Sequence, residues 1–393
     1  MNVVIEFFDA EMLENVYACL KYKFDKVYFV GEHDKMTLRD KSAFKNWLKK
    51  YCGVKEVVFH EVDEIGKIEY AHVVDRIAFL VEKEKNSNNR CFIDLTGGQD
   101  LVLAAMGAVA ERYDIPMIQY NITTGEALYT KDSEGPAGKV TEQNIKLTIA
   151  KYLELEGSAV NIGKQKNIKD ELSGENFRND VRKIYEVMIP TPSKWNKFSA
   201  VIKELKKYTN GTTICVPDVE LEKLYNKHKI EKRSFSDYMA SLERRRIVTE
   251  YIADETSETK IVFKNKRVLE VIKDAGCVLE LETYYTRLES SEYDDVRVGT
   301  CIDWDGIIHK SGDVENEIDV ITIKDNIINF VSCKNYEIDK PELYEIDSVA
   351  SHFGDKYVKK EIVTTGTVQE VCAERAKEMD ITITLIVDKN NSN

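Results

Sequence analysis

The sequence lacks the long apolar runs and paired cysteines that would indicate a membrane or secreted protein. No run of eighteen apolar residues occurs in the 393-residue chain, so we expect no membrane-spanning helix. The first residues also lack the basic segment of a signal peptide. The eight cysteines are scattered without a C-x-x-C pair, which argues against structural zinc and against a disulfide framework. We therefore expect a cytoplasmic protein with mostly buried thiols.

Positive charge is also scarce over the chain as a whole. The net charge is −13, which discourages non-specific binding to polyanions. The balance reverses between Lys194 and Arg246, where 13 basic residues stand against 7 acidic ones. A nucleic acid could bind this stretch, although a solvated helical face explains the same composition equally well.

The first 150 residues alternate strand-like and helix-like segments. Continuous apolar strands separated by helices are typical of a parallel sheet covered on both faces. We therefore predict a Rossmann-like domain over residues 1–156, with a late strand near 123–130 and a closing helix near 141–155. The earlier strands are expected at 3–8, 27–30, 54–60, 91–95 and 115–120.

A second, smaller region follows a polar segment. Residues 157–174 are predicted to be a linker. Residues 175–266, called the connector below, are predicted to be mainly helical. Two strand-like segments, 247–252 and 259–263, resemble the wing of a small winged helix. Nucleic-acid contact and a purely structural role both remain open for the connector.

The last region, residues 267–393, is predicted to be a further α/β domain. Helical sequence at 268–288 precedes three strand signals, at 296–304, 317–323 and 327–334. The last two strands are joined by a short polar segment and predict a β-hairpin.

This hairpin carries a candidate catalytic pair. Asp319 lies on its first strand and Lys334 ends its second, so a carboxylate and an ammonium can converge. Phosphodiester hydrolysis needs oxygen ligands for Mg²⁺ or Mn²⁺ and a cation that positions water or stabilises charge. Glu282, on the preceding helix, could add a carboxylate. Glu317 shares a face with Asp319, since side chains alternate along a strand, and either binds metal or pairs with a lysine.

The two strands together resemble a known nuclease signature. Asn316-Glu317-Ile318-Asp319-Val320, followed by Phe330-Val331-Ser332-Cys333-Lys334, is similar to the signature of PD-(D/E)XK nucleases. The likeness is greatest to CRISPR-associated proteins that join such a domain to a CARF sensor. It implies Glu282, Asp319, Ser332 and Lys334 as catalytic residues. Glu282, Asp319 and the backbone carbonyl of Cys333 would hold the metal, with Glu317 as a further candidate.

The serine in this signature departs from the commoner glutamate. The hydroxyl of Ser332 is a weaker, neutral ligand, so a metal would depend more on Glu282, Asp319 and the carbonyl of Cys333.

A glycine-containing loop in the first domain suggests a phosphate-binding site. The segment 94–100, Asp-Leu-Thr-Gly-Gly-Gln-Asp, joins a buried strand to a helix. Glycines permit close backbone approach, and N–H groups at a helix start attract phosphate. The segment matches neither the dinucleotide motif nor the P-loop, and an ordinary tight turn would look the same.

The same loop resembles the ligand loop of CARF domains, which bind cyclic oligoadenylates at a dimer interface. The resemblance implies that Thr96, Gly97, Gly98 and Gln99 line the ligand pocket, with Asp9 on another wall. Both segments follow strands of a doubly wound sheet, where ligands bind.

Together these features favour a ligand-activated nuclease. The resemblance implies a homodimer that binds cyclic tetra-adenylate and then cleaves DNA or RNA with Mg²⁺ or Mn²⁺ in type III CRISPR antiviral defence. The alternative is a ligand-responsive transcriptional regulator with an inactive nuclease-like domain, which Ser332 keeps open.

Overall fold

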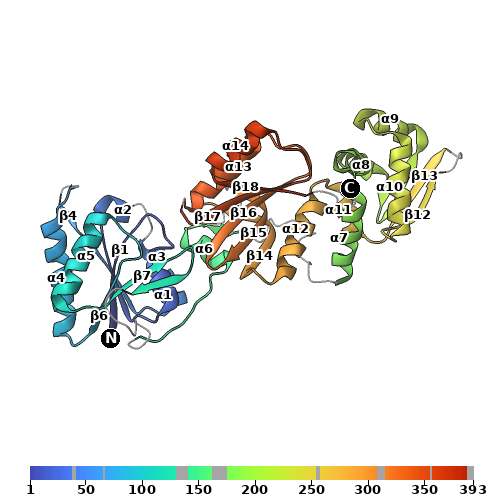
Figure 1. Cartoon of the computed structure of the whole chain (residues 1–393). Coiled ribbons are helices and arrows are strands. Elements are labelled where there is room, and N and C mark those ends of the chain that lie inside the picture. Colours follow the sequence, from blue (N-terminus) through green and yellow to red (C-terminus); the bar gives the residue numbers. More distant parts are fainter. Residues whose placement is uncertain are drawn as a thin grey trace.

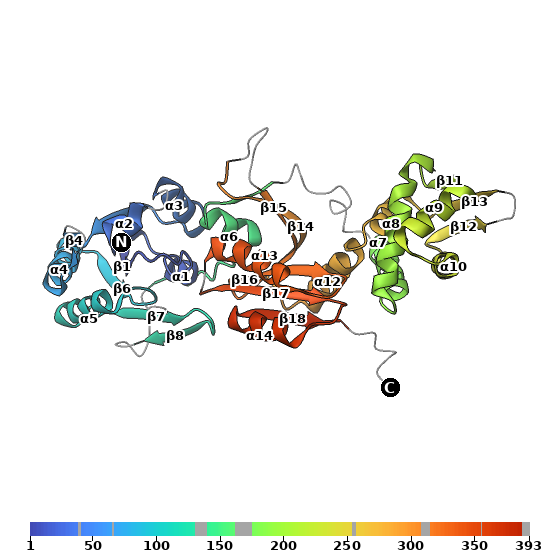
Figure 2. The same ribbon diagram turned by 90° about the horizontal axis from the view of Figure 1, so that it is seen from above.

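The computed structural model describes residues 1–37, 41–64, 67–129, 140–161, 175–253, 257–307, 315–354 and 356–386. The N-terminal domain, the C-terminal domain and the connector lie in a row (Figure 1). The C-terminal domain occupies the middle, although it is last in sequence. It therefore contacts both of the others (Figure 2).

The N-terminal domain is built on a six-stranded sheet in the order β3-β2-β1-β6-β7-β8. The strands pair in parallel except β8, which is antiparallel to β7. Because helices cover both faces, the central strands are mostly apolar, although Glu6 on β1 and Asp94 on β6 are also buried. The sheet strands are β1 (Asn2–Phe7), β2 (Lys26–Gly31), β3 (Glu56–Glu61), β6 (Arg90–Asp94), β7 (Met117–Asn121) and β8 (Glu126–Tyr129).

The helices divide between the two faces. One face packs on α4 and α5, and the other on α1, α3 and α6. The predicted Rossmann-like architecture is confirmed. A short pair, β4 (Asp63–Glu64) with β5 (Lys67–Ile68), lies beside the sheet. The helices of this domain are α1 (Tyr17–Lys21), α2 (His33–Thr37), α3 (Lys41–Trp47) with a π-helical turn (Leu48–Cys52), α4 (Tyr70–Asn86), α5 (Asp100–Tyr113) and α6 (Ile149–Leu155).

The closing helix is shorter than the sequence predicts. Residues 140–148 form an extended strap along α1, with Gln143 N–H donating to the Lys21 carbonyl. Helix α6 begins only after Thr148, whose hydroxyl accepts a hydrogen bond from the N–H of Lys151 and caps the helix.

The connector combines helices with a small antiparallel sheet in the order β10-β11-β13-β12. The predicted wing is confirmed as the β12–β13 pair. The elements are α7 (Glu175–Met188), α8 (Pro192–Glu204), η5 (Leu205–Tyr208), β10 (Thr209–Asn210), β11 (Thr213–Pro217), α9 (Asp218–His228), α10 (Lys232–Arg244), β12 (Val248–Ala253) and β13 (Glu258–Phe263).

The C-terminal domain has a mixed sheet in the order β18-β17-β16-β15-β14-β9. Strands β14, β15 and β16 are antiparallel, and β16, β17 and β18 are parallel. The elements are α11 (Lys266–Lys273), α12 (Cys277–Ser290), β14 (Asp295–Asp303), β15 (Glu315–Lys324), β16 (Ile327–Lys334), α13 (Lys340–Ala350), η6 (Ser351–Phe353), β17 (Val358–Thr364), α14 (Glu370–Glu378) and β18 (Ile381–Leu385).

The segment expected to be a linker also contributes to this sheet. Two of its residues form the short strand β9 (Ala159–Val160). This strand pairs with β14 at the sheet edge, opposite Asp303 and Ile302. Residues 162–174 of that segment lie outside the described residues.

The β15–β16 hairpin closes through a tight turn at Asp325 and Asn326. Both have positive φ, 52° and 67°, as a type I′ turn requires. The side chain of Asn326 is buried and accepts a hydrogen bond of 3.0 Å from the N–H of Leu147, in the strap. The hairpin tip is therefore fixed to the N-terminal domain.

One apolar core joins the first and last domains. It runs from Phe8 and Leu13, after β1, to Phe330 on β16, Phe353 in η6 and Val358 on β17. Across the C-terminal sheet, α11 and α12 share a second core with the connector. The eight cysteines are free. None of the helices in the described part of the chain is long and apolar enough to cross a membrane.

Candidate active site and ligand site

Three of the four candidate catalytic residues meet where β15 and β16 part. The ladder between these strands runs from Lys324 paired with Ile327 to Val320 paired with Val331. Beyond that pair, the side chain of Asp319 replaces the ladder. Its Oδ2 accepts hydrogen bonds from the backbone N–H of Cys333 at 2.7 Å and from the Ser332 hydroxyl at 3.4 Å.

A pocket opens at this point between the two strands and α13. Three residues of the predicted catalytic set, Asp319, Ser332 and Lys334, line it together with Glu317. The prediction that these side chains converge is therefore met by the geometry. The other lining residues are Asn316, Ile318, Phe330, Val331, Glu345, Ile346 and Val349.

Lys334 is held in place by a carboxylate that sequence reasoning did not identify. Its Nζ lies 3.3 Å from Oε2 of Glu345 on α13, and its side chain is only 16% exposed. Burial alone would lower the pKa of the ammonium, but nearby Tyr336, Glu345 and Asp319 raise it on balance. Lys334 therefore keeps its charge at neutral pH. Glu345 looks like an ordinary exposed helical glutamate in the sequence, so only the fold reveals the contact.

The oxygen atoms around this pocket suit a hard cation. Among the described residues, no three or more His, Cys, Asp or Glu side chains form a ready-made metal cluster. Mg²⁺ and Mn²⁺ do not need one, because they retain water and bind through one or two carboxylates plus substrate phosphates. Asp319, Glu317 and the Ser332 hydroxyl supply that donor chemistry. The carbonyl of Cys333 stays a predicted ligand.

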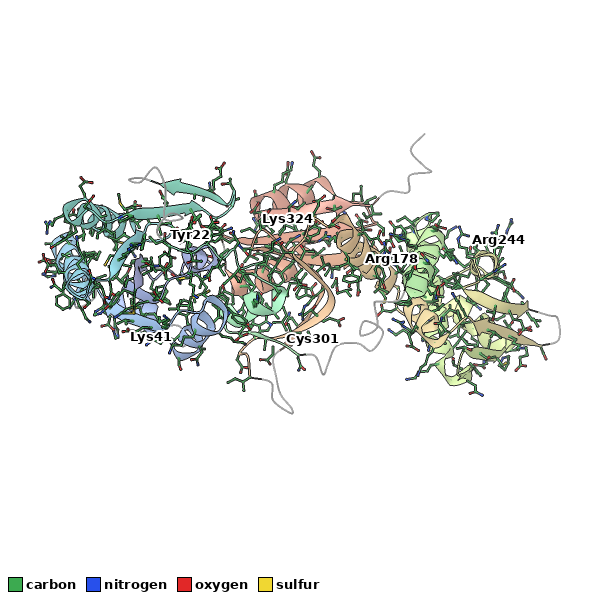
Figure 3. The ribbon with its side chains drawn as sticks, turned by 90° about the horizontal axis from the view of Figure 1, so that it is seen from below. Tyr22, Lys41, Arg178, Arg244, Cys301 and Lys324 are labelled. Atoms are coloured by element: carbon green, nitrogen blue, oxygen red, sulfur yellow. The ribbon has the colours of Figure 1, made fainter. Side chains whose placement is uncertain are left out.

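The helical carboxylate is where geometry departs from the sequence prediction. Glu282 does not line the pocket, because its face of α12 turns toward α7. Burial raises the pKa of Glu282, while Arg182 and Arg178 of α7 oppose that shift. Arg178 lies at the junction between the C-terminal domain and the connector (Figure 3).

Glu280, two residues earlier, faces the hairpin instead. Residues two apart on a helix point in nearly opposite directions, since each residue turns the helix by about 100°. Glu280 is buried, and it is close enough to Cys333 to raise the pKa of that thiol after burial and Asp319. Thr283, one turn further on, contacts the Cys333 sulfur at 3.7 Å.

The connector also fixes the residue after the candidate lysine. The side-chain amide of Asn335 donates to Oδ1 of Asn196 on α8 at 2.7 Å, and Asn196 donates back to the Asn335 carbonyl. A weaker contact of 3.5 Å reaches the carbonyl of Ala275. Hydrogen bonds therefore hold the end of β16 against α8 and the α11–α12 turn.

A hollow lined mainly by basic residues lies beside that turn. Five basic side chains and two acidic ones line it, between the end of α8, the β10–β11 turn and α11. Only two of the five fall within the basic stretch 194–246 singled out from the sequence. The basic residues are Lys203, Lys206, Lys266, Arg267 and Lys273. A second hollow contains Lys194, Arg244 and Arg245, and Figure 3 places Arg244 on the connector.

In the N-terminal domain, the candidate ligand residues gather at one edge of the sheet. Strand β1 pairs with β2 on one side and with β6 on the other, so the order in which successive strands are added to the sheet reverses between β1 and β6. Ligands of doubly wound sheets bind outside the carboxyl ends of strands at such a point. Asp9 follows β1, and residues 96–99 follow β6.

Three residues of the 96–99 loop have a defined structural role. Asp94 accepts hydrogen bonds from the N–H and the hydroxyl of Thr96, which bends the loop. Gly98 has a φ of 137°, a conformation that side chains rarely adopt. Gln99 precedes α5 and donates its side-chain amide to Glu32, after β2. Thr96 and Gln99 thus shape the loop through contacts within the domain.

Two buried carboxyl groups lie beneath this loop. Glu6 on β1 is 2% exposed, and its oxygens have no hydrogen-bond partner of good geometry among the described residues. Burial, and then the adjacent Asp94, raise the pKa of Glu6 well above its ordinary value. Burial also raises the pKa of Asp94 to about 6, against the lowering effect of the bonds from Thr96.

The comparisons with known proteins agree with this architecture. Residues 269–393 match the sequence profile of the Card1-like endonuclease domain family. Protein VC1899 from Vibrio cholerae is similar in structure, with a TM-score of 0.69 and 13% identity over 98% of this chain and 93% of that one.

Can2 from Sulfobacillus thermosulfidooxidans, solved in complex with cyclic tetra-adenylate, gives a TM-score of 0.63 and 15% identity over 97% of this chain and 93% of Can2. No curated protein matches the sequence. Residues 269–393 are thus similar to the Card1-like endonuclease domain, within a fold that the chain shares over nearly its whole length with VC1899 and Can2.

Proposed function

We propose that this protein is a metal-dependent endonuclease activated by a cyclic oligoadenylate, and that it acts in type III CRISPR defence. The observation that carries the catalytic part is the meeting of Asp319, Ser332 and Lys334 in one pocket of an endonuclease domain. The sensor part rests on the loop 96–99 at the switch point of the N-terminal sheet. Can2, which shares the fold, was solved with cyclic tetra-adenylate, so we propose the same ring as activator.

We propose a role for each of the polar side chains in the pocket. Bound Mg²⁺ or Mn²⁺ would polarise the scissile phosphate and lower the pKa of a water. Asp319 and Glu317 would hold the ion, with Asp319 kept in place by the Cys333 N–H. The charged Lys334 would bind a phosphate oxygen and stabilise the charge that develops on it. Glu345 accepts a hydrogen bond from that lysine.

The basic hollow beside α11 is the proposed path of the nucleic-acid backbone. Its residues adjoin Ala275, which contacts Asn335, the residue after Lys334. Ammonium and guanidinium groups attract phosphates without reading sequence, so this surface fits either DNA or RNA. The chain as a whole has a net charge of −13, so this hollow is a local basic surface on an acidic protein.

We further propose a homodimer in which two sensor domains hold one ligand. A cyclic tetra-adenylate can share a two-fold axis with such a pair. The ligand must bind the cleaving arrangement more tightly than the resting one, because only differential affinity shifts an equilibrium.

The test is cleavage of supercoiled plasmid and of labelled single-stranded DNA and RNA with Mn²⁺, with and without cyclic tetra-adenylate. Cleavage that needs the ligand and disappears with EDTA is expected. Sequence-specific duplex binding without cleavage of any substrate would instead favour the transcriptional regulator. A weak metal ligand at Ser332 would then explain the lack of cleavage.

A further inference from the structure

The loop after β1, residues 8–16, lies between the ligand loop and the endonuclease domain. It is buried for most of its length and tied together by Asn15, which is fully buried. The Asn15 amide donates to the Asp9 carbonyl at 2.9 Å, and its oxygen accepts from the Asp9 N–H at 2.7 Å. The two ends of the loop are thus connected by side-chain hydrogen bonds as well as by the backbone.

Glu14, in this loop, carries a buried carboxylate whose hydrogen-bond partners come from the other domain. One oxygen accepts from Nζ of Lys356 at 2.7 Å and from the hydroxyl of Tyr357 at 2.6 Å. The Glu14 side chain is 4% exposed. Burial and the Glu14 contact raise the pKa of Tyr357 to about 12, so the tyrosine stays protonated as a donor. A buried carboxylate with two donors resists displacement, because losing either donor leaves the charge poorly compensated.

The same side chain also touches the ligand loop. A methyl group added at Gly97 would lie 2.7 Å from Cβ of Glu14, so the glycine backbone and Glu14 are packed directly against each other. Neighbouring Thr96 is held by Asp94. A ligand that shifts the backbone at Gly97 must therefore also displace Glu14.

In the C-terminal domain, the hydrogen-bond partners of Glu14 are connected to the candidate active site through β17 and η6. Tyr357 immediately precedes β17, which pairs with β16 in a register that sets Lys334 opposite Thr364. Four residues before Tyr357, the ring of Phe353 stacks on Phe330, with centroids 5.0 Å apart. Phe330 lines the pocket that holds Lys334.

We propose that Glu14 is the residue through which occupation of the ligand loop is communicated to the endonuclease pocket. This inference rests on the proposed function and specifies the regulation of the same site. A contiguous path is only suggestive, since coupling has to be measured as an energy between sites. Linkage provides the measurement: if the ligand acts on the nuclease side through Glu14, changes on the nuclease side alter ligand affinity to the same extent.

The experiment is a double-mutant cycle read by binding of cyclic tetra-adenylate in EDTA, which prevents cleavage. Tyr357→Phe removes one donor from Glu14 without touching the ligand loop, and it keeps the ring. We expect it to change the Kd for the ligand by about fivefold. In a Glu14→Gln background the same change should shift the Kd by less than about twofold, because the charged carboxylate that binds the tyrosine hydroxyl is gone.

Lys146→Met is the matched control. The Lys146–Asp294 pair also links the N-terminal part of the chain to the C-terminal domain, but Lys146 is exposed and the pair includes neither Glu14 nor a residue of the ligand loop. Its removal should leave the Kd unchanged. In the cleavage assay at saturating ligand, Glu14→Gln should lower the ratio of rates with and without ligand by about tenfold. Thermal melts verify that each variant is folded.

The outcomes are distinguishable. Equal shifts from Tyr357→Phe in both backgrounds, or no shift in either, would overturn the role of Glu14 while the ligand-activated nuclease stands. A wild-type protein that neither binds the ligand nor cleaves in response to it would overturn the proposed function, and the coupling with it.

Discussion

The Asp319 carboxylate accepts a 2.7 Å hydrogen bond from the backbone N–H of Cys333, at the place where β15 and β16 stop pairing. A side chain thus replaces the ladder bond that the next strand would have supplied. The carboxylate is fixed by this bond, and the strands are free to open into the pocket that Ser332 and Lys334 also line.

Lys334→Ala should abolish most ligand-stimulated cleavage. Loss of one charge-stabilising group typically costs about 10²–10³ in rate. The melting temperature should change little, because the ion pair with the exposed Glu345 is of the kind worth at most about 1 kcal/mol. Lys359→Ala, at an exposed position on β17, is the control. Undiminished cleavage by the Lys334 variant would show that another cation serves this site.

Glu280 and Glu282 should differ in their importance. Glu280→Gln changes a carboxyl group buried beside Cys333, and we expect at least about a tenfold loss of cleavage, as for residues that support a metal site. Glu282→Gln should leave cleavage intact, since Glu282 faces Arg182 and Arg178. Rates measured at saturating Mn²⁺ and ligand decide the matter, and the reverse order would restore Glu282 as the catalytic helical carboxylate.

Ser332→Glu should increase the affinity for Mn²⁺ by about tenfold, because a further carboxylate adds negative charge to the proposed ligands. In EDTA the same variant should melt at a lower temperature than wild type, since two carboxylates would then repel each other near Asp319. Ser332→Ala isolates the loss of the hydroxyl. Mn²⁺ titration followed by thermal shift measures both effects, and identical curves for Ser332→Glu and wild type would exclude position 332 as a ligand.

The pair formed by Glu6 and Asp94 should make the N-terminal domain more stable in mild acid. Asp94 has its pKa raised from an ordinary 3.8 to about 6, and burial raises that of Glu6 as well. The folded state therefore holds protons more tightly than the unfolded state. The resulting stabilisation is full below about pH 4 and is lost as the pH rises through about 6.

Glu6→Gln is the variant that tests this pH dependence. It should raise the melting temperature at pH 8 and flatten the difference between pH 5 and pH 8. Thermal melts of both proteins across that range give the answer directly. A variant that follows the wild-type curve at every pH would mean that the pair does not titrate with folding.

Lys206→Glu should weaken substrate binding through the basic hollow. A reversed charge there loses phosphate contact, so we expect a higher KM, a shallower salt dependence by about one unit of slope and little change in kcat. Lys49→Glu changes the net charge equally but lies on the N-terminal domain, away from the hollow. Equal effects from both variants would indicate general electrostatics and not a defined path.

Local sequence pattern predicted most of the architecture and the convergence of Asp319, Ser332 and Lys334. The alternation of apolar strands and amphipathic helices predicted the N-terminal sheet, and the hairpin turn at Asp325 and Asn326 set the register that brings Asp319 near Lys334. The closing helix was predicted too long because its apolar residues lie in an extended strap, where tertiary hydrogen bonds replace helical ones. Helical periodicity could not orient α12, since either face of it carries a carboxylate.

By itself the sequence determined most of the strands and helices, and that a carboxylate and a lysine share a hairpin, because both depend on residues close together in the chain. Only the tertiary structure decided that Glu280 and not Glu282 faces that hairpin, and that Glu345 holds Lys334. It alone joined Glu14 to Tyr357, across 343 residues of sequence. Such contacts are set by how the domains pack against each other, and no periodicity within a segment encodes them.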